Sequence, residues 1–562
     1  MALAATGATP ALGAIGDVTD FTSKIPTDSF VHSLAAAPDG SIWVGETSTS
    51  PGSHTASRMR AAAVRKRSHG TSAPYARIGR LAPNGTMRLT SAGQPAYSTP
   101  TGVAWVGGAL WASISRAGSQ TSVAVRLAPT GEVEQTIALP AAHTEGIAEG
   151  PDGKPWAYLY NAPDGVARVD PGAGTATPIP GSPASLHVTN TGTPAVLGRG
   201  LFMYVTTAVQ DSIATINASG VVGSIGTGAG SNPMAAATGP DGSLWWTPNG
   251  AQSGTVVRQA AAGAAGQPIV MPAGTTGYGL VVAPDGAAWV LTEDTKIVRV
   301  TPGGGASSFT TPVVGRAAVI GADGNVWVAQ YPRGLFRVLS GVTPANTAPP
   351  LLSGRVEAGQ TLTAGNGEWK YMPSSYAYTW QQCASTDPNS CANVAGSGAA
   401  GSSYVVPGSG LLRGAGMRVL VTATNANGTS AAAASNIVTA DSPPSNRIVL
   451  GKSIRRGYVI STKVTVPGPG DIQQFGTVPG TARATENARR KKPKPVTACK
   501  PKLARMQAPG TRVITCSLSK KVRAMLAARG VTVTLSTTFV PSGGTRATVT
   551  RKVKVPKIAP KR

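Results

Sequence analysis

The chain has 562 residues, of which 41% are hydrophobic and 13% are charged. This length exceeds what one ordinary hydrophobic core accommodates, so several domains are expected, and the composition excludes a wholly disordered chain. Seventy glycines and 45 prolines favour many turns and short strands over long helices. No run of about 20 apolar residues occurs, so no membrane-spanning helix is expected.

The first residues, 1–12, are small and rich in alanine, but they lack the basic stretch that opens a full signal peptide. They are expected to be a leader, either the tail of a signal peptide that starts upstream of Met1 or a disordered segment. A secreted or cell-surface protein is the expected class.

A hairpin motif recurs five times between residues 37 and 330. Its copies are "APDGSIWVGE" (37–46), "GPDGKPWAYL" (150–159), "GPDGSLWWTPNG" (239–250), "APDGAAWVLTE" (283–293) and "GADGNVWVAQ" (321–330). In each copy Asp-Gly favours a tight hairpin turn, and the tryptophan is expected to pack between neighbouring sheets. A second hairpin follows each copy, for example "IGRLAPNGTMRLT" at 78–90. The pattern predicts repeated four-stranded antiparallel sheets.

The spacing of the tryptophans, near 45 residues, is typical of β-propeller blades. We expect an all-β chain whose residues 13–344 form a seven-bladed propeller. The anchors are Trp43, Trp111, Trp156, Phe202, Trp245, Trp289 and Trp327. The last blade has only three strands of its own, and residues 17–26 are expected to supply the fourth, which would protect the sheet edges.

Residues 47–76 interrupt the first blade with a Ser/Gly/Pro-rich, basic insertion. It is expected to be a surface loop. Its cluster Arg65, Lys66 and Arg67 is interpreted either as a contact for an anionic ligand or as a solvated charge run.

From residue 345 the pattern changes to alternating strands around Trp380, over 345–441, and it resembles bacterial immunoglobulin-like modules. A linker precedes a small β-rich module at 446–562, in which residues 519–530 have the spacing of a short helix. The four cysteines fall as two local pairs without zinc-site spacing, so two disulfides are expected. The pairs are Cys383 with Cys391 and Cys499 with Cys516.

The C-terminal module carries almost all of the net charge of +26, because residues 446–562 hold 26 Lys and Arg against only Asp471 and Glu486. Two partners fit such a module: nucleic acid, or an anionic polymer of the cell envelope. The second is favoured because no nucleic-acid-binding signature accompanies the charge and aromatic residues are scarce. The basic run 488–495 is expected to be a loop between strands.

Candidate ligand groups lie just before the first strand and just after the tryptophan strand of each blade, where the propeller mouth is expected. The candidates for substrate binding are His143, Glu145, Asn232, Arg316 and Gln330. The candidates for catalysis are His32 and Tyr278, and those for metal binding are Glu46 and Glu293.

Over about residues 13–341, the "GPDGSLWWT" hairpins combined with "IGRL" and "VTP" hairpins resemble virginiamycin B lyase, the streptogramin lyase family. The resemblance implies opening of a cyclic depsipeptide antibiotic by elimination. That family uses a histidine base, a Glu two residues before it and a second Glu about 14 residues after it, and the two Glu help to hold Mg²⁺.

The family pattern is incomplete in every blade of this chain. His32 and Glu46 have the family spacing, but Phe30 stands at the first Glu position. Glu293 matches the second Glu, but Tyr278 stands at the base position. Glu145 itself occupies the base position of its own blade.

These departures predict a ligand-binding, exported propeller with an eroded catalytic set, whose ligand is a small molecule, peptide or glycan. The alternative is a divergent Mg²⁺-dependent carbon–oxygen lyase, so the sequence leaves enzymatic activity undecided. A monomer is expected.

Overall fold

The structure is a computed structural model. It describes residues 13–48, 75–95, 98–116, 121–160, 162–184, 195–197, 202–206, 211–220, 222–260, 263–330, 332–357, 359–394, 401–406, 415–439, 445–480, 494–541 and 545–558. The chain divides into two compact units. One comprises Met1–Thr343 with Asn425–Gly428, and the other Pro344–Thr424 with Thr429–Arg562.

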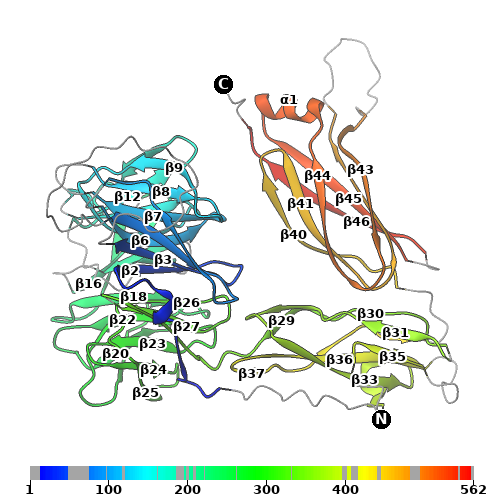
Figure 1. Ribbon diagram of the computed structural model, residues 1–562, viewed down its shortest axis with the longest axis horizontal. Helices are drawn as coiled ribbons and strands as arrows, with labels where there is room; N and C mark the ends of the chain where they lie inside the picture. Colours follow the sequence, from blue (N-terminus) through cyan, green and yellow to red (C-terminus); the bar gives the residue numbers. More distant parts are fainter. Residues whose placement is uncertain are drawn as a thin grey trace. The chain divides into compact units, whose positions relative to one another are not determined.

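The described residues are almost entirely β-structure (Figure 1), which confirms the predicted all-β class. They contain a single α-helix, α1 (Lys520–Ala528), and two short 3-10 helices, η1 (Thr22–Lys24) and η2 (Pro388–Ser390). No helix in this part of the chain is long and apolar enough to cross a membrane.

The first unit contains seven four-stranded antiparallel sheets, here called blades 1 to 7. Blade 1 is β2–β5 (Ser29–Ala36, Ile42–Ser48, Tyr75–Leu81, Met87–Ser91), and blade 2 is β6–β9 (Thr99–Val106, Ala109–Ser115, Val123–Leu127, Val133–Ala138). Blade 3 is β10–β13 (His143–Glu149, Pro155–Tyr160, Val166–Asp170, Thr175–Pro178), and blade 4 is β14–β17 (Ala195–Leu197, Phe202–Thr206, Ser212–Asn217, Val222–Gly226). Blade 5 is β18–β21 (Pro233–Thr238, Leu244–Pro248, Thr255–Gln259, Gln267–Val270), and blade 6 is β22–β25 (Gly277–Val282, Ala288–Thr292, Lys296–Val300, Ala306–Thr310).

Blade 7 joins the two ends of this unit. Its strands β26–β28 (Ala317–Ile320, Val326–Gln330, Gly334–Val338) are completed by β1 (Val18–Asp20), which pairs with β28 so that Val18 faces Val338. The predicted closure by an N-terminal strand is therefore confirmed. The first strands of the blades contact one another in cyclic order, with β26 returning to β2. This closed ring of sheets is the architecture of a β-propeller.

The Asp-Gly end of blade 5 shows why the hairpin motif repeats. Asp241 accepts hydrogen bonds from Ser243 N (2.9 Å) and Ser243 Oγ (2.7 Å), and it pairs with Arg258 at 2.6 Å. The guanidinium of Arg258 lies 5.6 Å from the ring centroid of Trp245, whose indole N–H donates to Ser243 Oγ. One carboxylate thus closes the turn and fixes the arginine that covers the tryptophan.

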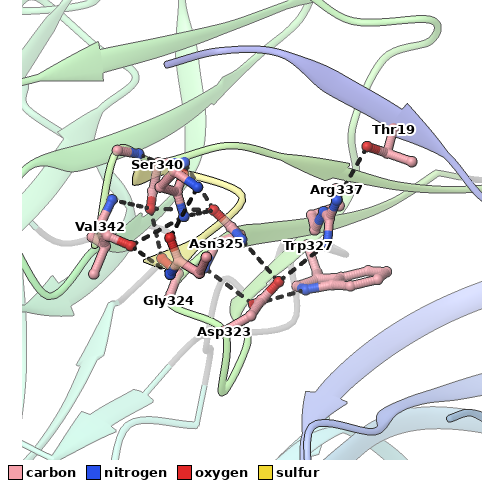
Figure 2. A network of polar contacts seen from close by, with 11 residues as sticks. Thr19, Asp323, Gly324, Asn325, Trp327, Arg337, Ser340 and Val342 are labelled. Carbon is pink, nitrogen blue, oxygen red and sulfur yellow. Dashed lines mark hydrogen bonds and ion pairs between the residues drawn. The ribbon is translucent and has the colours of Figure 1, made fainter. Parts of the chain in front are cut away.

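The aspartate–arginine pair recurs in four further blades, where the arginine stands opposite the tryptophan, on the third strand. In two of these blades the guanidinium also lies over the tryptophan ring, as Arg80 does over Trp43 and Arg337 over Trp327. The aspartate–arginine pairs are Asp39–Arg80, Asp152–Arg168, Asp285–Arg299 and Asp323–Arg337. In blade 7 Asp323 also accepts from Trp327 and Asn325, and Arg337 reaches Thr19 of the closing strand (Figure 2). The motif therefore stabilises the scaffold, and at the closure it also ties β1 to the blade.

Residues 345–439 form three further sheets. They are β29–β32 (Ala345–Ala348 with Glu368–Lys370), β30–β31–β35 (Leu352–Ser353, Thr361–Ala364, Ser403–Val405), and the sheet of β33, β34 and β36–β39 (Ser375–Cys383, Cys391–Asn393, Gly416–Asn425, Gly428–Thr429, Ala433–Ala434, Val438–Thr439). Trp380 is fully buried among Leu362, Val419 and their neighbours. The Cys383–Cys391 disulfide links the paired strands β33 and β34, as a local tie. The immunoglobulin-like assignment remains a prediction.

The C-terminal residues form two sheets with apolar residues packed between them. They are β40–β41–β44 (Val449–Arg456, Val459–Val466, Gly510–Ser517) and β43–β42–β45–β46 (Val496–Met506, Gly470–Val478, Val531–Pro541, Ala547–Val555). The Cys499–Cys516 disulfide joins β43 of one sheet to β44 of the other. The predicted helix is present as α1, with Val522 and Leu526 buried and Met525 partly buried.

Three sequence interpretations lie wholly or mostly outside the described residues. They are the leader at 1–12, the insertion with Arg65, Lys66 and Arg67, and most of the basic run 488–495. The domain boundaries at 344/345 and 441/446 also remain predictions.

Candidate functional site

The inner strands of five blades carry a one-residue β-bulge at corresponding positions. In each of these blades the register between the first and second strands shifts by one residue, so one residue of the first strand has no partner opposite it. These bulge residues are His32, Thr101, Glu145, Met234 and Tyr278. In blade 7 Arg316 takes the corresponding place, since it stands 11 residues before Trp327, as His32 stands before Trp43 and Tyr278 before Trp289. Bulges turn a side chain away from the regular pleat and are frequent at binding sites. We call these six positions the bulge ring.

Glycines next to the bulges let the inner strands approach one another. A Cβ atom on Gly102 would lie 2.7 Å from the backbone of Gly146 and Ile147 in the neighbouring blade. Gly102 and Gly146 each directly follow a bulge residue, Thr101 and Glu145. Close packing of the strands therefore places the bulge residues of blades 2 and 3 near each other.

Blades 6 and 7 bring Tyr278, Glu293 and Arg316 together. The Arg316 guanidinium lies 5.7 Å from the centroid of the Tyr278 ring. Burial raises the pKa of Tyr278 to about 12; Arg316 opposes this rise and Glu293 adds to it. Tyr278 is 5% exposed, whereas Arg316 and Glu293 are exposed. The cluster offers a neutral phenol beside an accessible cation.

His32 on β2 is mostly buried and touches the second strand of its own blade. Its Nε2 lies 2.9 Å from Thr47 Oγ1. Burial lowers the pKa of His32 to about 4, because the charged imidazolium loses its hydration. The imidazole is therefore neutral at pH 7.

The bulge residues of blades 2, 3 and 5 differ from these in chemistry. Thr101 Oγ1 lies 3.0 Å from Ser113 Oγ. Burial raises the pKa of Glu145, whose side chain is half-buried. Met234 is buried and apolar. The bulge ring thus carries six different side chains at one repeated backbone position.

Glu46 has its own structural partner. Its side chain is fully buried and accepts from Arg77 Nε at 2.7 Å. Arg77 also donates to Ser29 Oγ, while Asp28 accepts from Ser48 Oγ at 2.6 Å. Burial raises the pKa of Glu46, and Arg77 opposes that rise. This buried ion pair holds the strands that flank the insertion of blade 1.

The other sequence-predicted residues lie near the strand ends but not at the bulge positions. His143 is exposed at the start of β10, and Gln330 is partly buried at the end of β27. Asn232 has a left-handed backbone, with φ of 45°, and its N–H donates to Asp211 Oδ1 at 3.0 Å. Its backbone therefore has a turn-forming role.

A Mg²⁺ centre does not fit the side chains that the structure describes. This part of the chain contains no group of three or more His, Cys, Asp or Glu side chains that could hold a metal ion. Of the two predicted carboxylate ligands, Glu46 is bound to Arg77, and the positive charge of that guanidinium disfavours a cation at the same oxygen atoms. We derive no step through a metal.

A cavity of about 500 Å³ lies away from the bulge ring, between blade 3 and the 218–220 turn of blade 4. Its charged lining residues already have partners, since Lys154 pairs with Asp170 and Arg168 pairs with Asp152. It therefore offers fewer available groups for a polar ligand than the cluster around Arg316.

Sequence reasoning missed Thr101 and Met234. A constant distance to the next tryptophan would have found them, since Met234 stands 11 residues before Trp245 and Thr101 stands 10 before Trp111. It also missed the third-strand arginines, although "GRL", "VRL", "ARV", "VRQ", "VRV" and "FRV" recur at matching places.

The ring of sheets and the bulge ring define a β-propeller protein. The chain matches no protein-family model, and no curated protein matches its sequence. Among solved structures it is similar to a streptogramin B lyase (17% identity, 58% of this chain and 98% of the other, TM-score 0.45). It is also similar to virginiamycin B lyase from Staphylococcus aureus (15% identity, 57% of this chain and 98% of the other, TM-score 0.44). A third similar structure is a gluconolactonase from Xanthomonas campestris (14% identity, 43% of this chain and 85% of the other, TM-score 0.33). The propeller itself is defined by the sheets described above.

Proposed function

We propose that this protein is an exported propeller that binds a peptide or glycan ligand at the bulge ring. The observation that carries the proposal is the bulge repeated in five of the seven blades, which presents a different side chain in each of them at corresponding positions of the first strand. A scaffold that repeats its backbone and presents different side chains at one repeated position is suited to recognising a polar, asymmetric ligand.

The chemistry of the bulge ring favours a ligand with a carboxylate. Arg316 is exposed beside Tyr278 and forms no ion pair within 4 Å with a described carboxylate, so its charge is available for an acidic group. Tyr278 beside it offers a phenol that stays protonated, because its pKa is about 12. The half-buried Glu145 and the neutral His32 supply hydrogen-bonding groups for the hydroxyl or amide groups of the same ligand.

Two disulfides support export, because such bonds form and persist in oxidising compartments. Mass spectrometry of the protein from its native source, with and without reduction, tests this step. Free thiols at all four cysteines would remove the support.

A binding screen with substituted proteins tests the site. Acidic glycans and carboxylate-bearing peptides are screened against the intact chain, and the hits are measured again with Arg316→Ala and Tyr278→Phe. Arg316→Ala is expected to weaken binding tenfold or more, about 1.4 kcal/mol. The matched control is Arg88→Ala, which removes an exposed cation from the outer strand β5 and is expected to leave the affinity within twofold. Ligands that bind all variants equally would place the site elsewhere.

The second candidate is a divergent lyase, which one observation favours: His32 is neutral at pH 7 and sits at a bulge. A base with a pKa near 4 removes protons weakly, however, and the described side chains do not fit a Mg²⁺ centre. Incubation with a type B streptogramin and Mg²⁺ tests this function. Ring opening that disappears in His32→Ala but persists in Arg88→Ala would establish the lyase and replace binding as the main activity.

A further inference from the structure

The C-terminal sandwich gathers exposed cations at the end that carries α1. The helix is fixed there by backbone hydrogen bonds, since Ser519 N donates to Ala498 O and Ile558 N donates to Leu526 O. Exposed cations at this end come from the β40–β41 turn, the start of β43, the first turn of α1 and the end of β46. They are Arg456, Lys494, Lys520, Lys521, Lys554 and Lys557, which we call the basic end.

No carboxylate among the described residues neutralises the basic end. Within the described parts of 445–558 the only acidic residue is Asp471, and it pairs with Arg505 at 3.9 Å. Asp471 lies at the opposite end of β42 from Val478, which packs near the helix. Asp471 and Val478 are seven residues apart along the strand, which corresponds to a distance of about 23 Å. That distance exceeds the Debye length of about 8 Å at physiological salt, so Asp471 does not offset the charge.

Two of these cations oppose the dipole of α1. Lys520 and Lys521 occupy the first turn of α1, where the helix dipole disfavours positive charge, and no acidic residue accompanies them. The preceding Ser519 does not cap the helix, because its hydroxyl donates to Thr497 O. Repulsion at this end costs stability, and binding to a polyanion would relieve it.

The basic end lacks the aromatic surfaces that single-stranded nucleic acids stack on. Residues 446–562 contain only Tyr458, Phe475 and Phe539 as aromatics. Tyr458 is covered by Arg523, whose guanidinium lies 5.0 Å from the ring centroid, and Phe539 is fully buried. The buried Cys499–Cys516 disulfide also indicates an oxidising compartment. Both observations favour a polyanion of the cell envelope over nucleic acid.

We propose that the basic end binds a phosphodiester-linked polymer of the cell envelope. Lysine ammonium groups suit this ligand because they pair with phosphate oxygens as mobile point charges. The site is separate from the bulge ring, so either one functions without the other.

Two fourfold variants of the intact chain, with equal net charge, test the proposal. The test variant is Lys520→Gln/Lys521→Gln/Lys554→Gln/Lys557→Gln. The control is Lys463→Gln/Lys502→Gln/Arg505→Gln/Arg512→Gln, which removes four exposed cations from elsewhere on the same sandwich. The probe is poly(glycerol phosphate), with affinity measured between 50 and 200 mM salt, and thermal melting confirms that each variant is folded.

The test variant is expected to lose at least tenfold in affinity at 50 mM salt, and its dependence on salt is expected to flatten, because fewer counterions are released. The control is expected to lose less than threefold. Equal losses in both variants would overturn the proposal, since net charge alone would then explain binding. Tighter binding of single-stranded DNA or of a uronate polymer, with the same sensitivity to the test variant, would overturn the assignment to a phosphodiester polymer.

Discussion

The two ends of a propeller blade differ in whether their side chains are repeated or varied from blade to blade. At the Asp-Gly end, five blades repeat the same aspartate–arginine ion pair, in which the carboxylate and the guanidinium neutralise each other. In three of them the guanidinium also lies over the tryptophan ring. At the bulge end, the same backbone irregularity carries imidazole, hydroxyl, carboxylate, thioether and phenol groups in blades 1, 2, 3, 5 and 6. Repeated chemistry at a repeated position serves the scaffold, whereas varied chemistry at a repeated position is what recognition of one ligand requires.

The largest expected effect comes from removing a tryptophan at the Asp-Gly end. Trp245 is fully buried between blades 5 and 6, so Trp245→Ala should lower the free energy of unfolding by about 3–5 kcal/mol. Chemical denaturation followed by tryptophan fluorescence measures this loss. Arg316→Ala at the bulge end is the comparison, and because Arg316 is exposed it should change stability by less than about 0.5 kcal/mol. Similar losses in the two variants would contradict the division of roles between the two ends.

A smaller loss of stability is expected when the carboxylate of the same motif is removed. Asp241→Ala removes the hydrogen bonds to Ser243 and the pair with Arg258, and it should cost about 1–2 kcal/mol.

The dependence of this loss on pH identifies its cause. Burial acts to raise the pKa of Asp241, but the hydrogen bonds from Ser243 and the contact with Arg258 outweigh it and lower the pKa to about 2. The pKa in the folded protein is therefore below the usual aspartate value of 3.8, so the stabilisation is complete above pH 3.8 and disappears as the pH falls through about 2. The stabilities of wild type and Asp241→Ala should converge over that range. A difference that stays constant down to pH 2 would show that the charge is unimportant.

Features that depend on residues close together in the sequence could be predicted from it. Asp241-Gly242 closes its turn within four residues of Trp245, and Val522 and Leu526 share one face of a single helix. The closing strand at 17–26 was also predictable, because the last blade has only three strands of its own and needs a fourth. Local turn preferences and periodicity decide the turn and the helix face, whereas the closing strand follows from expecting four strands in every blade.

Features that depend on the register between strands could not be predicted in the same way. Arg258 covers Trp245 only because β20 pairs with β19 in one register. The spacing from Trp245 marks the position of Met234, but the bulge itself follows only from the pairing of β18 with β19. Glu46 has the family spacing from His32, but its partner Arg77 lies 31 residues away in sequence, beyond the insertion. A motif spacing fixes positions along the chain, whereas burial and partners follow from the fold.

The smallest expected effect at neutral pH concerns His32 at the bulge end. Burial holds its pKa at about 4, below the usual histidine value of 6.5, so the folded protein binds a proton there less readily than the unfolded chain. Its linked stability is therefore complete above pH 6.5 and is lost as the pH falls through about 4. His32→Gln does not titrate, so relative to this variant the wild type should lose stability between pH 6.5 and 4 and show no further relative change below that. NMR titration of the imidazole checks the pKa directly. A midpoint near 6.5 would show that His32 is hydrated like an exposed side chain, which would contradict its place as a mostly buried, neutral group at the bulge end.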